Sequence, residues 1–154
     1  YAQAGVTGPF VQDNVSCSRR KVLRGLHFQH PQAQGKLVYV LRGEVVDVAL
    51  DVRRGSPTFG KWFAARLSAE NQRQLWLPPG FAHGFCVTSD VALFCYKCTD
   101  YYDRDAERTV LWNDQALAID WPVEHPQLSA KDANARPLSK IEPTKLPPYR
   151  TSNS

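Results

Sequence analysis

Short hydrophobic segments separated by turn residues dominate this chain. Segments rich in Val, Leu, Phe, Tyr and Trp lie at 22–29, 36–41, 45–52, 61–67, 74–77, 84–88 and 91–101. Gly, Pro, Ser and Asp stand between several of them, at 42–43, 54–57, 78–80 and 89–90. Many short strands punctuated in this way predict an all-β sandwich or barrel.

The segment 45–52 shows the clearest alternation of apolar and polar residues. Val46, Val48, Leu50 and Val52 fall on one face of a strand, and Asp47, Asp51 and Arg53 fall on the other. Such a pattern predicts a half-buried strand, with one apolar and one polar face.

Helical signals appear only in the C-terminal third. Ser129 can cap a single turn that has Asp132 at its third helical position, as in a capping box. The segment 141–154 contains Pro147 and Pro148 and is predicted to be a polar tail. The chain shows no internal repeat, so residues 1–154 are predicted to form one domain with a few short C-terminal helical turns.

Composition excludes several classes of protein. Hydrophobic residues make up 43% of the chain and charged residues 22%, which is ordinary for a globular domain. No apolar run reaches the length of a membrane-spanning helix, so no membrane partner is expected. The net charge of +4 comes without a stripe of Lys and Arg interleaved with aromatic residues, so no nucleic-acid partner is expected.

The cysteines and the absence of methionine bear on location and completeness. Cys95 and Cys98 form one C-x-x-C pair without the second pair that a zinc site needs. We therefore expect free thiols in a reducing compartment, which indicates a cytoplasmic protein. The chain contains no Met, so we expect either that an initiator Met was removed or that this sequence is the later part of a longer chain.

The first candidate for chemistry is a Pro-x-Gly-x-x-His pattern that ends at His83. Gly80 allows a sharp turn, which places His83 at the start of the following strand. The pattern resembles the second histidine motif of the cupin superfamily, whose jelly-roll barrels commonly hold a metal ion. The first cupin motif is His-x-His followed by Glu. Here His27 and His30 are three residues apart and would face opposite ways, and Lys36 stands where a carboxylate ligand is wanted. We therefore expect no metal.

Without a metal, three residues could carry out proton transfer next to a ketone. His27 could act as the base, and the Lys36 ammonium could stabilise an enolate oxygen. Tyr96, on a strand face shared with Phe94 and Cys98, could donate a proton from the opposite side. Structural roles remain open for each: a hydrogen-bonded histidine, a solvated lysine and a core aromatic ring. His83 could equally be a turn histidine bonded to its own backbone.

Eight motifs in a fixed order give a more specific indication. They are Gln12-Asp-Asn14, the segment 23–29 (LRGLHFQ), 34–38 (QGKLV), 79–85 (PGFAHGF), Tyr96-Lys97, Glu107-Arg108, Trp112-Asn-Asp114 and 128–132 (LSAKD). In this order they resemble the dTDP-4-dehydrorhamnose 3,5-epimerase family, over residues 10 to 140. The resemblance implies a cupin-type jelly-roll barrel that works as a homodimer without cofactor or metal. The expected partner is a dTDP-linked 4-keto-6-deoxy sugar.

The resemblance also implies a role for each site residue. His27 would abstract protons, with Asp132 orienting it; Lys36 would stabilise the enolate and Tyr96 would act as the acid. The nucleotide sugar would be bound by Gln12, Asn14, Arg24, His83, Tyr102, Glu107 and Lys131, with Tyr102 stacking on the base. The family reaction inverts carbons 3 and 5 of dTDP-4-dehydro-6-deoxy-D-glucose to give dTDP-4-dehydro-L-rhamnose.

Two features of the sequence depart from a simple match. Arg24 and His27 would face opposite sides of a regular strand, so we expect a bulge at Gly25, or else an Arg24 that acts near the subunit edge. Val15-Ser16-Cys17 replaces the usual His-Ser-Arg, and the family carries a further N-terminal segment with a substrate-binding Arg and Glu. We expect that part of the N-terminal wall of the pocket is missing from this sequence.

Three other functions remain open on the sequence. A related enzyme could invert only one centre, or move the keto group, on a similar dTDP-sugar with the same residues. A metal-dependent cupin enzyme would bind Fe, Mn or Zn through His27 and His83. A sugar-binding jelly roll without activity would bind the dTDP-sugar but exchange no protons.

Overall fold

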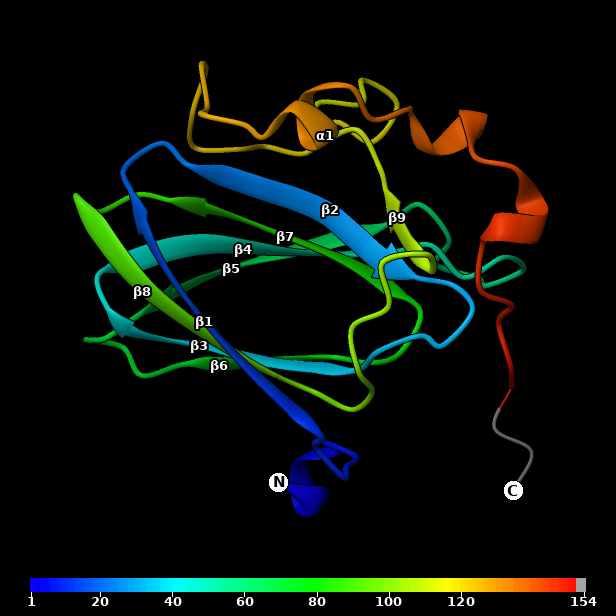
Figure 1. Ribbon diagram of the computed structural model, residues 1–154, viewed down its shortest axis with the longest axis horizontal. Coiled ribbons are helices and arrows are strands. Elements are labelled where there is room, and N and C mark those ends of the chain that lie inside the picture. The colour runs from blue at the N-terminus through cyan, green and yellow to red at the C-terminus, as the bar shows by residue number, and fades with distance from the viewer. Residues whose placement is uncertain (152–154) are drawn as a thin grey trace.

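The computed structural model describes residues 1–151 as two antiparallel sheets that face each other (Figure 1). The four-stranded sheet has the order β1-β8-β3-β6, and the five-stranded sheet has the order β5-β4-β7-β2-β9. The strands are β1 (Gln12–Arg19), β2 (Leu23–Gln29), β3 (Lys36–Arg42), β4 (Glu44–Asp51), β5 (Trp62–Ser68), β6 (Gln74–Leu77), β7 (Phe81–Val87), β8 (Val91–Cys98) and β9 (Glu107–Thr109). This arrangement confirms the predicted all-β jelly-roll barrel.

The predicted segments correspond to β2 through β8, and only two ends differ by more than one residue. β7 begins at Phe81, so His83 lies inside the strand and not at its start, and β8 ends at Cys98. The predicted helical turn is confirmed as α1 (Ala130–Ala133), where the Ser129 hydroxyl accepts a hydrogen bond from the Asp132 N–H. Short 3-10 turns are η1 (Ala2–Ala4), η2 (Leu138–Lys140) and η3 (Pro143–Lys145).

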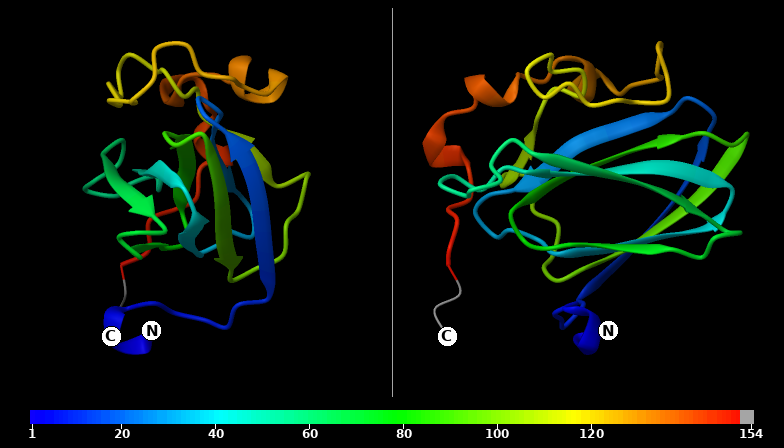
Figure 2. Two further views of the ribbon diagram at one scale, coloured as in Figure 1. Left: turned by 90° about the vertical axis from the view of Figure 1, so that its left-hand side faces the viewer. Right: turned by 180° about the vertical axis from the view of Figure 1, so that it is seen from behind.

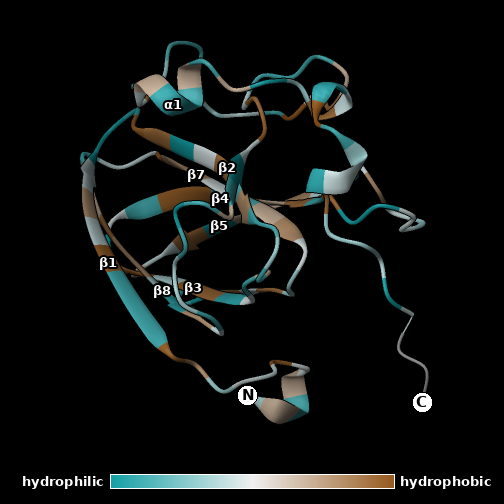
Figure 3. Cartoon of the chain, turned by 45° about the vertical axis from the view of Figure 1, so that its right-hand side comes forward, coloured by the Kyte–Doolittle hydropathy of each residue, from teal (hydrophilic) through white to brown (hydrophobic). Residues whose placement is uncertain are grey.

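Strand β1 was not predicted because its pattern is the reverse of an ordinary strand. Its more buried positions are polar, namely Gln12, Asn14, Ser16 and Ser18. Val15 points the other way and is 65% exposed. Figure 3 shows the first part of β1 in the hydrophilic colour although it belongs to the barrel wall. Strand β9 is three residues long and was too short and polar to predict.

Two hydrophobic cores lie on opposite faces of the five-stranded sheet. One fills the space between the sheets, around Val45, Phe85 and Phe94. The other lies under the C-terminal segments that cover the outer face, around Leu50 and Trp121 (Figure 2). β4 is therefore buried on both faces, and the expectation that it is half-buried was wrong: Asp47 is 0% and Asp51 1% exposed.

The C-terminal segment packs against the barrel as far as Tyr149. The Arg54 N–H donates to the Pro147 carbonyl at 2.8 Å, and the Tyr149 N–H donates to the Arg54 carbonyl at 2.9 Å. Leu146 is 5% exposed, so this part of the predicted polar tail is anchored. Residues 152–154 of that tail lie outside the described residues.

The expected bulge in β2 is present at Gly25. Across the β2–β7 pair, Arg24 is opposite Phe85 and His27 is opposite His83, so β2 has one extra residue between them. Gly25 has φ +119°, and a Cβ atom there would lie 2.6 Å from both the Gly84 Cα and the His83 carbonyl oxygen. The bulge changes the side-chain alternation, which lets His27 face the barrel interior although Leu23 and Leu26 are buried in the outer core.

Gly25→Ala should destabilise the protein strongly. The substitution combines a backbone conformation that costs about 1–3 kcal/mol with a clash against two backbone atoms. Urea unfolding should show a larger loss than for Gly55→Ala, because Gly55 has φ +84° but nothing within 4 Å of its Cβ position. Equal losses for the two variants would contradict the close approach at Gly25.

Candidate functional site

A cavity of about 270 Å³ lies between the inner faces of the two sheets. It is lined by Gln12 and Asn14 of β1; His27, Phe28 and Gln29 of β2; Gln34 and Lys36; Tyr96 and Cys98 of β8; Tyr102; and Glu107 of β9. Seven of these residues were predicted from the sequence to be site residues. Phe28, Gln29, Gln34 and Cys98 were not, although they lie within or beside the quoted motifs.

The register of the four-stranded sheet explains why polar side chains gather here. Lys36 is opposite Cys98, which is opposite Gln12 on the next strand. Two residues further along β1, Asn14 is opposite Tyr96 of β8. Directly opposed residues point to the same face of a sheet, so residues distant in sequence form one polar inner surface.

His27 is paired with Asp132 from α1, a helix that covers the other side of β2. The His27 Nε2 and Asp132 Oδ1 atoms are 2.6 Å apart, and Asp132 Oδ2 accepts the Gly25 N–H at 3.1 Å. Burial acts to raise the pKa of Asp132, but the hydrogen bond and charge of His27 outweigh it and hold that pKa below its usual value. An ionised carboxylate can only accept, so the imidazole proton lies on Nε2 and Nδ1 is left as the basic nitrogen.

Lys36 and Tyr96 have altered acidities inside the barrel. Burial lowers the pKa of the Lys36 ammonium, partly opposed by the nearby Cys98, Glu107 and Asp47. Burial, together with Cys98, raises the pKa of the Tyr96 hydroxyl. The Lys36 Nζ lies 5.8 Å from the centre of the Tyr96 ring. Tyr96 is therefore a protonated donor at neutral pH, with the Lys36 side chain beside it.

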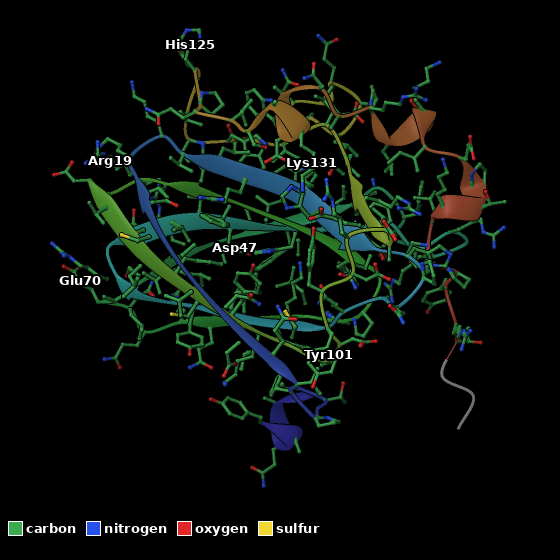
Figure 4. The ribbon with its side chains drawn as sticks, viewed as in Figure 1. Arg19, Asp47, Glu70, Tyr101, His125 and Lys131 are labelled. Atoms are coloured by element: carbon green, nitrogen blue, oxygen red, sulfur yellow. The ribbon has the colours of Figure 1, made fainter. Side chains whose placement is uncertain are left out.

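His83 is placed deeper than its predicted role would suggest. It is 6% exposed and is not among the side chains that line the cavity. Its Nε2 is 2.8 Å from Asp47 Oδ2, so it does not bond its own backbone as a turn histidine would. Figure 4 shows Asp47 inside the barrel. This pair was not predicted, because the alternation in β4 assigned Asp47 only to a polar face.

The remaining predicted residues lie at the rim of the cavity. Tyr102 is 52% exposed, and its hydroxyl donates to Glu107 Oε2 at 3.0 Å. Lys131 Nζ is 2.7 Å from the same oxygen. Burial acts to raise the pKa of Glu107, but Lys131, His27 and Tyr102 together outweigh it and hold that pKa below its usual value. Arg24, Lys131 and Asp132 line an adjacent depression of about 420 Å³ that shares His27 with the cavity.

The described part of the chain offers no ready metal centre or membrane span. Within residues 1–151, no three His, Cys, Asp or Glu side chains cluster as possible ligands. His27 and His83 each already hold a carboxylate through Nε2. No helix among these residues is both long and apolar enough to cross a membrane. Cys17, Cys86, Cys95 and Cys98 are all free thiols.

Comparison with known proteins identifies close relatives. The family model described as dTDP-4-dehydrorhamnose 3,5-epimerase matches residues 1–140. The dTDP-4-dehydrorhamnose 3,5-epimerase of Pseudomonas aeruginosa is 60% identical over 134 residues, which are 86% of this chain and 74% of the relative. The dTDP-4-dehydrorhamnose 3-epimerase of Streptomyces niveus is 44% identical over 142 residues, 91% of this chain and 69% of the relative.

A solved structure agrees with the sequence comparison. The dTDP-6-deoxy-D-glucose-3,5-epimerase RmlC of Legionella pneumophila, in complex with dTDP-4-keto-L-rhamnose, superposes with a TM-score of 0.94 at 56% identity. The match covers 97% of this chain and 80% of that one. The jelly roll described above is therefore shared along almost the whole length of the chain.

Proposed function

Because this chain belongs to the dTDP-4-dehydrorhamnose 3,5-epimerase family, we propose that it inverts carbons 3 and 5 of dTDP-4-dehydro-6-deoxy-D-glucose. The product is dTDP-4-dehydro-L-rhamnose. Both carbons flank the 4-keto group, so loss of either proton gives an enolate whose charge rests on the same oxygen. One base and one oxyanion stabiliser can therefore serve both inversions.

The proposal rests chiefly on the 2.6 Å contact between His27 and Asp132 beside the cavity. The ionised Asp132 fixes the proton on His27 Nε2, which leaves Nδ1 free to take a proton from carbon. Asp132 is thus a positioning residue, and His27 is the base. As the imidazolium forms, the buried carboxylate stabilises its charge.

Lys36 is the group that stabilises the enolate oxygen. An ammonium in a poorly solvated cavity interacts with a developing oxyanion much more strongly than it would in water. The site needs no metal for this step, because Lys36 supplies the positive charge. Its inward position next to Tyr96 would let one substrate contact both groups.

Tyr96→Phe should separate proton removal from inversion. Without the phenol, His27 can still remove a proton and return it to the same face, so exchange with solvent continues. Delivery from the opposite face should fall by about 100-fold or more. In deuterium oxide, the variant should incorporate deuterium while the stereochemistry at carbons 3 and 5 is mostly retained.

The matched control is Tyr39→Phe, which removes a hydroxyl from the neighbouring strand β3. Tyr39 neighbours the inward-facing Val38 and Val40 and does not line the cavity. This variant should invert both centres at the wild-type rate. Inversion by Tyr96→Phe at that same rate would remove Tyr96 from the mechanism.

We assign binding of the nucleotide sugar to a group of residues at the cavity and its rim. They are Gln12, Asn14, Arg24, His83, Tyr102, Glu107 and Lys131. The guanidinium of Arg24 is exposed and suits a diphosphate, because its fork matches phosphate oxygens. His83 would act from beneath the cavity wall, since its ring is 6.3 Å from that of Tyr96.

The test of the function is NMR of dTDP-4-dehydro-6-deoxyglucose with the protein in deuterium oxide. Deuterium entering carbons 3 and 5, with formation of the L-rhamno product, is the expected result. Exchange at carbon 3 alone would favour a single-centre epimerase, a reaction represented among the relatives by the 3-epimerase of Streptomyces niveus. Binding of substrate without any exchange would overturn the enzymatic proposal.

We also propose a homodimer located in the cytoplasm. Family membership supports the dimer, and four free thiols suit a reducing compartment. Sedimentation of the purified protein as a species of twice the chain mass is the expected result. A monomer at micromolar concentration would contradict the proposed assembly.

A further inference from the structure

The loop that carries Tyr102 is held by the side chains of three glutamines. This loop, residues 99–106, follows β8 and leads into β9. Gln34 Nε2 donates to the Asp100 carbonyl at 2.8 Å, and Gln12 Oε1 accepts the Tyr102 N–H at 2.8 Å. A loop on the protein surface would otherwise satisfy these backbone groups with water and move more freely.

Gln29 makes the most extensive set of contacts with this loop. Its Nε2 donates to the Tyr101 carbonyl at 3.3 Å, and its Oε1 accepts the Asp103 N–H at 2.9 Å. The two bonds fasten the residues immediately before and after Tyr102. The same Nε2 also donates to the Gln32 carbonyl at 3.0 Å.

The position of Gln29 in the barrel makes these bonds rigid. The side chain is 4% exposed and lies on β2, two residues beyond His27 and therefore on the same face. A buried amide whose donor and acceptor groups are both engaged has little freedom to rotate. The loop is thereby tied to the strand that bears the proposed base.

We propose that Gln29 is a positioning residue that holds Tyr102 in place for the nucleobase of the substrate. This inference rests on the proposed function, in which Tyr102 stacks on the base. Gln29 itself contributes nothing to proton transfer. It lowers the entropic cost of binding, because Tyr102 is already oriented before the nucleotide arrives.

The expected consequence is a change in nucleotide affinity without a change in chemistry. Gln29→Met keeps the length of the side chain but removes both bonds to the loop. We expect dTDP to bind about tenfold more weakly, and KM to rise by a similar factor while kcat stays within about twofold. A general disturbance of β2 would instead lower kcat, because His27 lies two residues away. Gln74→Met, on the exposed start of β6, is the matched control and should change neither value.

A double-mutant cycle with Tyr102→Ala tests whether Gln29 acts through Tyr102. If it does, Gln29→Met will weaken dTDP binding in the wild-type background and have no further effect in the Tyr102→Ala background. Affinity for inorganic pyrophosphate, which has no base to stack, should be the same in all four proteins. Should Gln29→Met fail to fold, Gln29→Asn keeps the amide but is too short to reach the loop, and it serves in its place.

Two results would overturn the inference. The first is that Gln29→Met weakens dTDP binding equally in the wild-type and Tyr102→Ala backgrounds. The second is that Gln29→Met lowers kcat and leaves KM unchanged. A wild-type chain that binds no dTDP would overturn the proposed function, and the role of Gln29 with it. If the wild-type chain binds dTDP and the Gln29→Met variant binds it equally well, only the proposed role of Gln29 is contradicted.

Discussion

His27→Asn should reduce epimerisation by about 100- to 10,000-fold and stop proton exchange at both carbons together. Asparagine is too short to reach Asp132 in the way that His27 Nε2 does, but Asp132 Oδ2 still accepts the Gly25 N–H, so the buried carboxylate keeps a partner. What the variant lacks is a basic nitrogen. Stopped-flow or NMR assays in deuterium oxide would measure the loss, and dTDP affinity would show that the site remains intact.

The control for this variant is His125→Asn, which changes an exposed histidine on the C-terminal segment (Figure 4). It should exchange both protons at the wild-type rate. Deuterium entering carbon 3 but not carbon 5 in His27→Asn would show that two bases divide the reaction. The buried pair of His83 and Asp47 would then be the second candidate.

Lys36→Met should reduce kcat by about 100- to 1,000-fold, because it removes the positive charge that the proposed mechanism places next to the developing oxyanion. The thioether fills a similar volume, so the cavity should keep its shape. Lys61→Met, which changes an exposed lysine just before β5, is the matched control and should have wild-type activity. A Lys36→Met enzyme with more than a tenth of the wild-type kcat would contradict the role.

The same substitution should make the protein more stable at neutral pH. Burial lowers the pKa of Lys36 below its ordinary value of 10.5, so the folded chain binds this proton less tightly than the unfolded chain. The free energy of unfolding therefore rises with pH between the lowered pKa and 10.5, and the cost of the buried charge is fully present below that window. When urea unfolding is measured at several pH values, the free energy of unfolding of the Lys36→Met variant should lack this rise. A variant less stable than wild type at pH 7 would indicate that the charge is well compensated.

Activity should respond to the same titration with the opposite sign. In the proposed mechanism Lys36 can stabilise the enolate only while it is protonated, so kcat of the wild-type protein should fall as pH rises through the lowered pKa. Residues that serve an active site often lower the stability of the folded protein, and a buried charge is one example.

Much of the fold and of the site could be derived from particular residues. The alternating and apolar runs gave the seven strands β2 to β8, because side-chain periodicity is a local property. The need for Arg24 and His27 to share a pocket predicted the bulge at Gly25. The ordered motifs predicted most of the residues that the barrel brings to the cavity and its rim. His83, which the motifs also included, is instead buried beneath the cavity wall.

Other features depended on which surface each strand turns inward, and the sequence alone does not contain that information. An alternating strand shows which residues share a face, but the same pattern fits either orientation. β1 was missed because it turns Gln12 and Asn14 toward the cavity, and β4 was misjudged because the C-terminal segments cover its second face. The pairing of His83 with Asp47, and the hold of Gln29 on the Tyr102 loop, arise only when the two sheets close around a polar interior.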